Sequence, residues 1–348
     1  MPPPEVGGRV PNFTLPHVDG SNAMFYDRVT GGPLVMLVCA SAGMPPARTV
    51  VEGVAHRGDA FRRHDTEIFV VSGDGVEMHR QLAAVLDLEA HFLSDPKNEV
   101  RPGLLAGAGE QGLRTYVLDP NQRILALIDN GDPARHADRA LAALDARPAV
   151  PSPLRLTTAA PVLLLPNVLR LELCDELVAR WQRDHAEGVV GVIVDGQTVD
   201  QQVSTKKRSL DHGVTDPAMV KLLSSRLAAM LPVEMNKAFY FDMPFYFDTL
   251  IVIGYEAGRG DYFRTHRDNM TPRSANRRYA MSLNLNDDYD GGELRFPEYG
   301  PHLYRPAKGA AAVFSCSLLH EALPVTRGRR LVLTTFFCAS RQRPRRQE

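Results

Sequence analysis

Three side chains in the second half of the chain are of types that bind transition metals. In Thr265-His266-Arg267-Asp268-Asn269 an imidazole and a carboxylate stand at positions i and i+2, so both lie on one face if the segment is extended. A second histidine, His320, follows in Leu318-Leu319-His320-Glu321. Two histidines and one carboxylate on one face of a metal leave its other positions open, which is the arrangement of Fe(II) oxygenases. The sequence therefore predicts an Fe(II) site made of His266, Asp268 and His320.

Alone, a His-x-Asp pair is weak evidence, because it occurs by chance in many chains. The supporting signal is Arg330, which follows His320 across the turn 324–328 and begins an apolar segment. A guanidinium that points into a barrel needs an anion, and a carboxylate matches its fork geometry. The C5 carboxylate of 2-oxoglutarate is therefore the expected partner of Arg330. His185, His212 and His302 lack a second ligand type at strand spacing, so we assign them surface or packing roles.

Short strand-like segments surround these residues and must position them. They are residues 249–255, 279–285, 293–296, 310–316 and 330–337, separated by Gly and Pro turns. Two helices precede them, one over 172–183 and one that Asp216 and Pro217 begin. Many short strands after a helical lead-in predict a double-stranded β barrel or sandwich. Residues 191–208 are polar and contain several glycines, a pattern that agrees equally with a lid over the iron and with a plain surface loop.

Three longer stretches carry a resemblance to a known family. They are Tyr255-Glu256-Ala257-Gly258 ahead of His266-Arg267-Asp268, then residues 290–296 (DGGELRF), and residues 320–325 (HEALPV) running on to Gly328-Arg329-Arg330. From about residue 160 to 339 the chain resembles the prolyl 4-hydroxylase-like 2-oxoglutarate/Fe(II) dioxygenases. The resemblance implies a double-stranded β-helix (jelly-roll) domain. It also implies that the two histidines and Asp268 bind iron, and that Arg330 anchors the distal carboxylate of 2-oxoglutarate.

The resemblance assigns further roles and shows one departure. It implies that Tyr255 hydrogen-bonds the co-substrate or a metal-bound water; a half-buried strand tyrosine is the other interpretation. Many relatives carry Tyr where this chain has Asn284, so the second contact to the co-substrate carboxylate would come from an amide. Halogenating relatives lack the carboxylate of Asp268, which favours hydroxylation here. The implied cofactors are Fe(II) and 2-oxoglutarate as co-substrate, with ascorbate as an optional addition.

The first half has a different pattern. Apolar runs at 34–40 and 67–72 predict buried parallel strands, and residues 47–63, 76–86 and 134–144 predict helices. Residues 114–118 and 124–128 flank the turn signal Asp119-Pro120-Asn121, which predicts two strands joined by a turn. The sum is an α/β layered domain. Residues 8–16 and 113–119 resemble peroxiredoxins, which implies a thioredoxin-like fold.

The peroxidatic cysteine of that family is missing. Thr49 stands in its place, and a threonine hydroxyl has no anionic form near neutral pH, so thiolate attack on peroxide is not available there. Cys39 lies inside the predicted first strand and is interpreted as a core residue. We therefore expect a degenerate redoxin, not a peroxidase, which serves as a docking or dimerisation module; peroxide consumption by this half would revive the peroxidase hypothesis.

Composition limits the remaining possibilities. The 348 residues suggest a domain over 1–147, a proline-rich linker over 148–155, a dioxygenase domain over 156–340 and a basic tail over 341–348. A net charge of -1 offers no field for nucleic acid or an anionic membrane surface. The start lacks a basic segment followed by an apolar one, so we expect a cytoplasmic protein. The four cysteines have no C-x-x-C spacing and suggest no disulfide framework.

Two hypotheses of function remain open. The first is 2-oxoglutarate- and O2-dependent hydroxylation of a C–H bond in a peptide, a protein side chain such as proline, or a small metabolite, with release of succinate and CO2. The second is a binding module in which the iron site senses oxygen or 2-oxoglutarate and the redoxin half docks a partner, with a homodimer through the N-terminal domain as one arrangement. Succinate production coupled to a substrate would separate the two.

Overall fold

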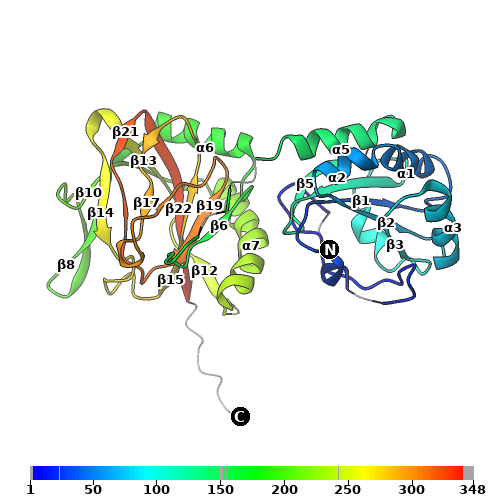
Figure 1. Ribbon diagram of the computed structural model, residues 1–348. Coiled ribbons are helices and arrows are strands. Elements are labelled where there is room, and N and C mark those ends of the chain that lie inside the picture. Colours follow the sequence, from blue (N-terminus) through cyan, green and yellow to red (C-terminus); the bar gives the residue numbers. More distant parts are fainter. Residues whose placement is uncertain are drawn as a thin grey trace, which may run out of the picture. The chain divides into compact units, whose positions relative to one another are not determined.

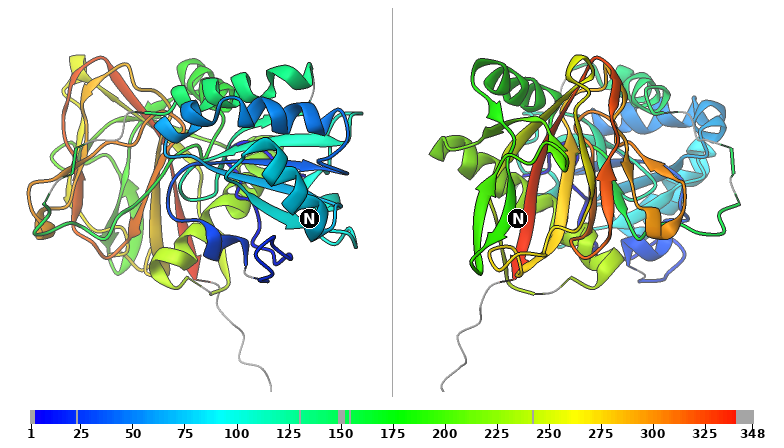
Figure 2. Two further views of the ribbon diagram at one scale, coloured as in Figure 1. Left: turned by 45° about the vertical axis from the view of Figure 1, so that its right-hand side comes forward. Right: turned by 90° about the vertical axis from the view of Figure 1, so that its left-hand side faces the viewer.

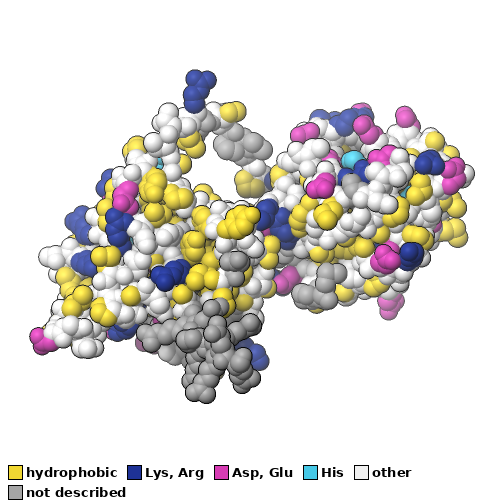
Figure 3. All heavy atoms as spheres, turned by 90° about the horizontal axis from the view of Figure 1, so that it is seen from below, with side chains coloured by type: hydrophobic (Ala, Val, Ile, Leu, Met, Phe, Trp, Pro, Cys, Tyr) yellow, Lys and Arg dark blue, Asp and Glu magenta, His cyan; other side chains and the backbone are white. Residues whose placement is uncertain are grey.

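The computed structural model describes residues 3–22, 24–129, 131–148, 152–153, 155–241 and 243–339. The chain divides into two compact units, Met1–Ser152 and Pro153–Glu348, and each is described by itself. The predicted basic tail and residues 149–151 and 154 of the predicted linker lie outside the described residues. Within the described ranges, no helix combines the length and hydropathy of a bilayer span. On the face in Figure 3, basic and acidic side chains are both present and scattered, as the near-zero net charge leads one to expect.

A five-stranded mixed sheet with the order β3-β2-β1-β4-β5 forms the centre of the first unit. Strands β1 to β3 are parallel, whereas β4 runs antiparallel to both β1 and β5. This confirms the two predicted parallel strands and the predicted turn at residues 119–121. The strands are β1 (Leu34–Cys39), β2 (Glu67–Ser72), β3 (His91–Ser94), β4 (Leu113–Leu118) and β5 (Ile124–Ile128). All six residues of β1 are buried, which explains its unbroken apolar sequence.

Helices cover one face of this sheet. Val35 and Leu37 of β1 face α1 (Ala47–Ala55), α3 (Val76–Leu86) and α5 (His136–Asp145), and Figure 1 shows α1 and α5 along the sheet. Met36 and Val38 face the N-terminal segment on the other side. The remaining helices are η1 (Phe25–Arg28), α2 (Gly58–Arg63), α4 (Arg101–Leu104) and η2 (Pro133–Arg135).

The single helix predicted over 47–63 is wrong, because the structure divides it into α1 and α2. At the break the Arg57 backbone leaves the helical region, with φ -109° and ψ 17°. Its guanidinium returns to the Gly53 carbonyl oxygen (3.1 Å) and to Asp138 of α5 (Nε to Oδ1, 2.5 Å). The chain therefore turns where α1 meets α5, a tertiary contact that the sequence pattern does not contain.

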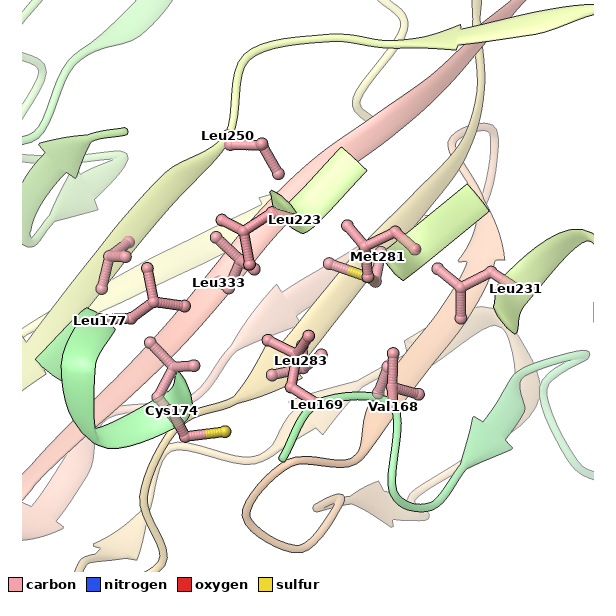
Figure 4. Packing of buried hydrophobic residues seen from close by; sticks show 14 of the residues in the cluster. Val168, Leu169, Cys174, Leu177, Leu223, Leu231, Leu250, Met281, Leu283 and Leu333 are labelled. Carbon is pink, nitrogen blue, oxygen red and sulfur yellow. The ribbon is translucent and has the colours of Figure 1, made fainter. Parts of the chain in front are cut away.

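Two helices precede the strands of the second unit, α6 (Leu171–Arg183) and α7 (Pro217–Phe239). The Asp216 carboxylate accepts a hydrogen bond from the Ala218 amide (2.9 Å), and Pro217 takes the first helical position, as predicted. Figures 1 and 2 show both helices beside the large sheet, and Figure 4 shows the apolar core between them. In that core Leu177 of α6 and Leu223 of α7 pack with Leu333.

The strands of this unit form two main sheets. The larger has the order β6-β19-β15-β22-β13-β11-β7, with β12 also on β22, and the smaller has the order β10-β14-β20-β17-β18. The larger contains β6 (Leu163–Leu165), β7 (Ala186–Glu187), β11 (Leu210–Gly213), β12 (Phe245–Phe247), β13 (Ile251–Glu256), β15 (Arg277–Asn284), β19 (Ala311–Ser315) and β22 (Arg329–Ala339). The smaller contains β10 (Lys207–Arg208), β14 (Tyr262–His266), β17 (Leu294–Arg295), β18 (Leu303–Tyr304) and β20 (His320–Ala322).

Two two-stranded sheets complete the unit: the hairpin of β8 (Val190–Val194) with β9 (Gln197–Gln201), and the long-range pair of β16 (Asp290–Gly291) with β21 (Val325–Arg327). Short helices η3 (Ala257–Arg259) and η4 (Pro297–Tyr299) lie between strands. A second apolar cluster joins the two main sheets, with Ile253 and Val332 from the larger and Leu294 and Ala322 from the smaller. This is the predicted double-stranded β-helix with its helical lead-in.

The strand β22 alternates between two environments. Leu331, Leu333 and Phe337 belong to the core under α6 and α7. Arg330, Val332, Thr334 and Phe336 line the cavity between the two sheets. Because side chains alternate along a strand, the same strand builds the core with its odd positions and the cavity with its even ones.

Candidate metal centre

The three predicted donors meet at the end of two paired strands. His266 is the last residue of β14 and His320 the first of β20, and the two residues are opposite one another in the antiparallel ladder. Asp268 follows β14 by two residues. Its Oδ1 lies 3.4 Å from His266 Nε2 and its Oδ2 3.5 Å from His320 Nε2. Among the described residues, this is the one group of three His, Cys, Asp or Glu whose ligand atoms all lie within 4.8 Å.

Backbone contacts orient the donors toward a common point. His266 Nδ1 lies 2.7 Å from the Arg264 carbonyl oxygen, and His320 Nδ1 lies 3.0 Å from that of Leu318. Each Nδ1–H therefore donates to a carbonyl and leaves Nε2 as the free acceptor, as in metal-binding histidines. Asp268 Oδ2 is buried and has no hydrogen-bond partner among the described residues. A buried, unpaired carboxylate oxygen between two imidazole acceptors fits a cation.

Burial and neighbouring charges shift the pKa of two of the donors, His320 and Asp268, toward the forms that bind a metal. Burial lowers the pKa of His320, so its imidazole stays neutral to a lower pH than that of an exposed histidine. Burial alone would raise the pKa of Asp268, but the neighbouring His320 and His266 hold it below its ordinary value. Neutral imidazoles beside an ionised carboxylate are the ligand forms that divalent metals require.

A cavity of about 650 Å³ opens over the three donors, and Arg330 lies in its wall. The Arg330 side chain is almost fully buried; its Nη2 donates to Ser282 Oγ (3.3 Å) and Asn284 Oδ1 (3.1 Å). No carboxylate of the described residues lies within ion-pair distance of it. A buried guanidinium without a counter-charge is costly, so this cavity is built to receive an anion.

The other two predicted co-substrate residues differ in their placement. Tyr255 lines the cavity, with its ring centroid 6.0 Å from Arg330 Cζ, and burial raises the pKa of its phenol. Asn284 is not part of the cavity wall. Its Nδ2 donates to Tyr289 Oη (2.9 Å) and to the Pro306 carbonyl oxygen, while its Oδ1 accepts from Arg330. Asn284 therefore contacts Arg330 without lining the cavity itself.

Several residues at the site were missed at the sequence level. The Phe263 ring stacks on His266 at 3.5 Å between centroids. Lys207 is opposite Phe263 in the sheet and forms a buried ion pair with Asp211 (Nζ to Oδ2, 2.6 Å). The Glu298 carboxylate accepts hydrogen bonds from Arg267 (2.7 Å) and from the Leu319 amide (2.8 Å). Phe263 stands three residues before His266, so regular strand alternation would place the two on opposite faces. The register shift between them, which the sequence does not reveal, brings the rings together. Lys207 lies in a basic run that indicates a solvated surface.

Residues 191–208 form the β8–β9 hairpin and β10, so the plain-loop alternative is wrong. The hairpin lines the cavity through Val190, Gly191 and Asp200. Asp200 pairs with Arg273 from across the cavity mouth (Nη1 to Oδ2, 3.1 Å). The hairpin also carries several exposed apolar side chains, Ile193, Val194 and Val199, and Val189 directly before it is exposed as well.

Among its described residues, the first unit presents no thiol at the helix position expected from its fold. Thr49 lies in the first turn of α1, and Cys39 is the last residue of β1. Burial raises the pKa of the Cys39 thiol to about 12. Arg114 is held by Asp129 (Nη2 to Oδ2, 2.7 Å) and by carbonyl oxygens of Leu104 and Ala106. Helix α1 contains no cysteine, so no reactive thiolate can form on it.

Comparisons with known proteins divide the chain in the same way. Residues 250–338 match the model of the 2OG-Fe(II) oxygenase superfamily, and residues 6–126 match that of the AhpC/TSA family. A PKHD-type hydroxylase of Psychrobacter sp. is 26% identical over 50% of this chain and 67% of its own length. Chloroplastic peroxiredoxin Q of Gentiana triflora is 27% identical over 40% of this chain and 72% of its own.

Solved structures similar to the chain include a Pseudomonas putida prolyl-4-hydroxylase, with 23% identity, a TM-score of 0.40 and coverage of 52% of this chain and 94% of that one. A peroxidoxin from Mycobacterium tuberculosis has 24% identity and a TM-score of 0.38, and covers 42% of this chain and 99% of that one. By the two family matches, the second unit carries a 2OG-Fe(II) oxygenase region and the first a peroxiredoxin-like region. The protein is a dioxygenase that depends on Fe(II) and 2-oxoglutarate, with hydroxylation as its general reaction.

Proposed function

We propose that His266, Asp268 and His320 hold Fe(II) and that the protein hydroxylates a C–H bond of an organic substrate. The observation that carries this proposal is the convergence of the three donors around the unpartnered Asp268 Oδ2, beneath a cavity that also presents Arg330. When bound, Fe(II) with 2-oxoglutarate and O2 supplies an oxidant that replaces C–H by C–OH, while 2-oxoglutarate becomes succinate and CO2. The chain's own residues bind, orient and shield the reactants.

In this proposal Arg330 binds the distal carboxylate of 2-oxoglutarate, and Ser282 gives it a second contact. Both lie on the cavity wall, and the guanidinium is held by Asn284, which fixes its direction. This revises the predicted role of Asn284 from direct contact to support. Tyr255 lies on the same wall and donates its phenolic hydrogen toward the bound anion, since its high pKa keeps the hydroxyl protonated.

The substrate proposed is a prolyl residue of a peptide or protein, with a small metabolite as the alternative. The names of the relatives, PKHD-type hydroxylase and prolyl-4-hydroxylase, support the first. The exposed apolar side chains of the β8–β9 hairpin beside the cavity also suit a polypeptide better than a small polar metabolite.

Anaerobic titration with Fe(II) and then 2-oxoglutarate tests the centre, by the weak visible charge-transfer band of the chelate. We expect the band in the wild type and in His302→Ala, a histidine outside the cavity, and no band in His266→Ala. Succinate release with prolyl peptides tests the reaction. Iron bound without the band would overturn the co-substrate role of Arg330. A band without coupled succinate for any substrate would favour the sensing module.

A further inference from the structure

The first unit contains a second set of two histidines and one carboxylate, at the edge of its sheet. His17 forms an antiparallel bridge opposite Leu93, so His91, two residues earlier on β3, points to the same face. His91 in turn pairs with Phe69 of β2, which places Glu67, two residues before Phe69, on that face as well. Three donors distant in the sequence therefore project to one side of the sheet.

These three residues line one cavity of about 620 Å³. The cavity wall also carries the carboxylates of Asp59, Asp87 and Glu89, and among its described residues Arg62 is the Lys or Arg side chain. The excess of acidic side chains favours a cationic ligand.

His17 is arranged like a metal-binding histidine. The residue is 8% exposed, and its Nε2 is buried without a hydrogen-bond partner among the described residues. The Asp19 amide donates a hydrogen bond to His17 Nδ1 (3.2 Å), and Asp19 Oδ1 lies 3.0 Å from the same nitrogen. Since Nδ1 accepts in this hydrogen bond, metal binding at Nε2 requires the imidazole proton to move to Nδ1, where the neighbouring Asp19 carboxylate can accept it. A carboxylate behind one imidazole nitrogen leaves the other as a bare acceptor, which is how metal-bound histidines are held.

Glu67 is oriented in a similar way. Its Oε1 accepts hydrogen bonds from the Thr30 amide and hydroxyl (both 2.9 Å), which leaves Oε2 directed to His91, 3.8 Å from Nε2. His91 itself is stacked on Phe69 at 4.5 Å between centroids, which restricts the movement of its ring.

The spacing of the two imidazoles agrees with a shared ion. Their ring centroids are 5.4 Å apart at 45°. Two imidazoles on one tetrahedral zinc ion, with Zn–N of about 2.0–2.1 Å, place their centroids roughly 5 Å apart. The set is less convergent than the iron centre, whose rings are 4.3 Å apart and whose three ligand atoms lie within 4.8 Å. Small side-chain rotations must therefore accompany binding.

We propose that His17, His91 and Glu67 form a binding site for a divalent transition-metal ion of the Zn²⁺ type, separate from the iron centre. The remaining positions of the ion face the cavity and stay open. The opposing charge is Arg28, which pairs with Asp19 (Nη1 to Oδ2, 3.4 Å) and weakens binding by reducing the charge behind His17. Imidazole ligands suit Zn²⁺ and Cu²⁺ better than Mg²⁺ or Ca²⁺, so those hard cations should bind poorly.

The test is a Zn²⁺ titration of the full chain against a chromophoric chelator. In His266→Ala/His320→Ala, which removes the iron centre, we expect one Zn²⁺ per chain. His17→Gln, His91→Gln and Glu67→Gln added to this background should each weaken binding at least about tenfold. The matched control is His56→Gln, which changes a third histidine of the same cavity and should leave the affinity unchanged.

Stoichiometry in the otherwise wild-type chain gives an independent measurement if the double variant fails to fold. There the expected value is two Zn²⁺ per chain, falling to one in His17→Gln. Absence of stoichiometric binding in the folded double variant, or an affinity that His17→Gln and Glu67→Gln leave unchanged, would overturn the proposal. Equal competition by Mg²⁺ would also overturn it, since a merely acidic cavity would not distinguish the two ions.

Discussion

The two units differ in whether the site expected from their fold is complete. In the second unit, both histidines, the carboxylate and the cavity arginine are present, and the sheet register brings the donors together. In the first unit the sheet and helices of a peroxiredoxin-like fold are intact, but α1 carries Thr49 where a thiolate would be needed. A fold persists because its core packs, whereas a site persists only if each of its few side chains is kept. The two units of this chain show both outcomes.

The largest effect should come from Asp268→Ala, which removes the central donor of the iron centre. We expect Fe(II) affinity to fall by more than about 100-fold, since even outer-shell partners of a metal contribute 10- to 100-fold. The measurement is iron retention with succinate production. Asp175→Ala is the control, because that carboxylate pairs with Lys308 away from the cavity. Fe(II) binding that persists in Asp268→Ala would contradict the assignment of Asp268 as a ligand, and with it the statement that the second unit keeps a complete site.

Arg330→Met should have the next largest effect. Truncating one partner of a buried charge pair costs roughly 2–5 kcal/mol, so we expect the Kd for 2-oxoglutarate to rise about 100-fold while Fe(II) still binds. Titration of the charge-transfer band measures both. Arg329→Met is a matched control, because this neighbour points to the opposite side and pairs with Glu256 (2.6 Å). Equal losses in the two variants would contradict the assigned role.

A smaller effect is expected when a thiol is returned to the first unit. Thr49→Cys and Ala47→Cys each put one in the first turn of α1. We expect peroxide consumption to stay within about tenfold of the wild type, because Arg48, next to both positions in the sequence, is paired with Glu52 (Nε to Oε1, 2.7 Å) and gives a thiolate little stabilisation. Peroxide loss in the presence of a thiol reductant is the measurement. Fast turnover of peroxide in either variant would show that the first unit lacks only the cysteine of a working peroxidase site.

The smallest expected effect concerns Cys39. Burial raises the pKa of this thiol to about 12, so at pH 8 it is un-ionised and inaccessible. We expect no alkylation by iodoacetamide in the folded protein at pH 8 and full alkylation after unfolding in urea. Mass spectrometry of the peptide that contains Cys39 distinguishes the two. Labelling in the folded state would reopen the peroxidase hypothesis for this half.

The sequence contained most of the second unit's site but not its supports. The donors could be predicted because metal ligation demands few residue types at fixed spacing. The role of Asn284 could not, since whether an amide faces the cavity or the back of Arg330 depends on Tyr289 and Pro306, which approach from other segments. The break between α1 and α2 was likewise invisible, because the contact with Asp138 that accompanies it lies far along the chain.

The alternation along β22 restricts how this enzyme can change. A point substitution at Thr334 or Phe336 alters the cavity and leaves the odd-numbered core positions in place. Deletion of one residue within the strand would instead exchange the two faces, turning apolar side chains into the cavity and a guanidinium toward the helices. New substrate preferences are therefore open to this scaffold through replacement of side chains, whereas a change of chain length in β22 would remove stability and catalysis together.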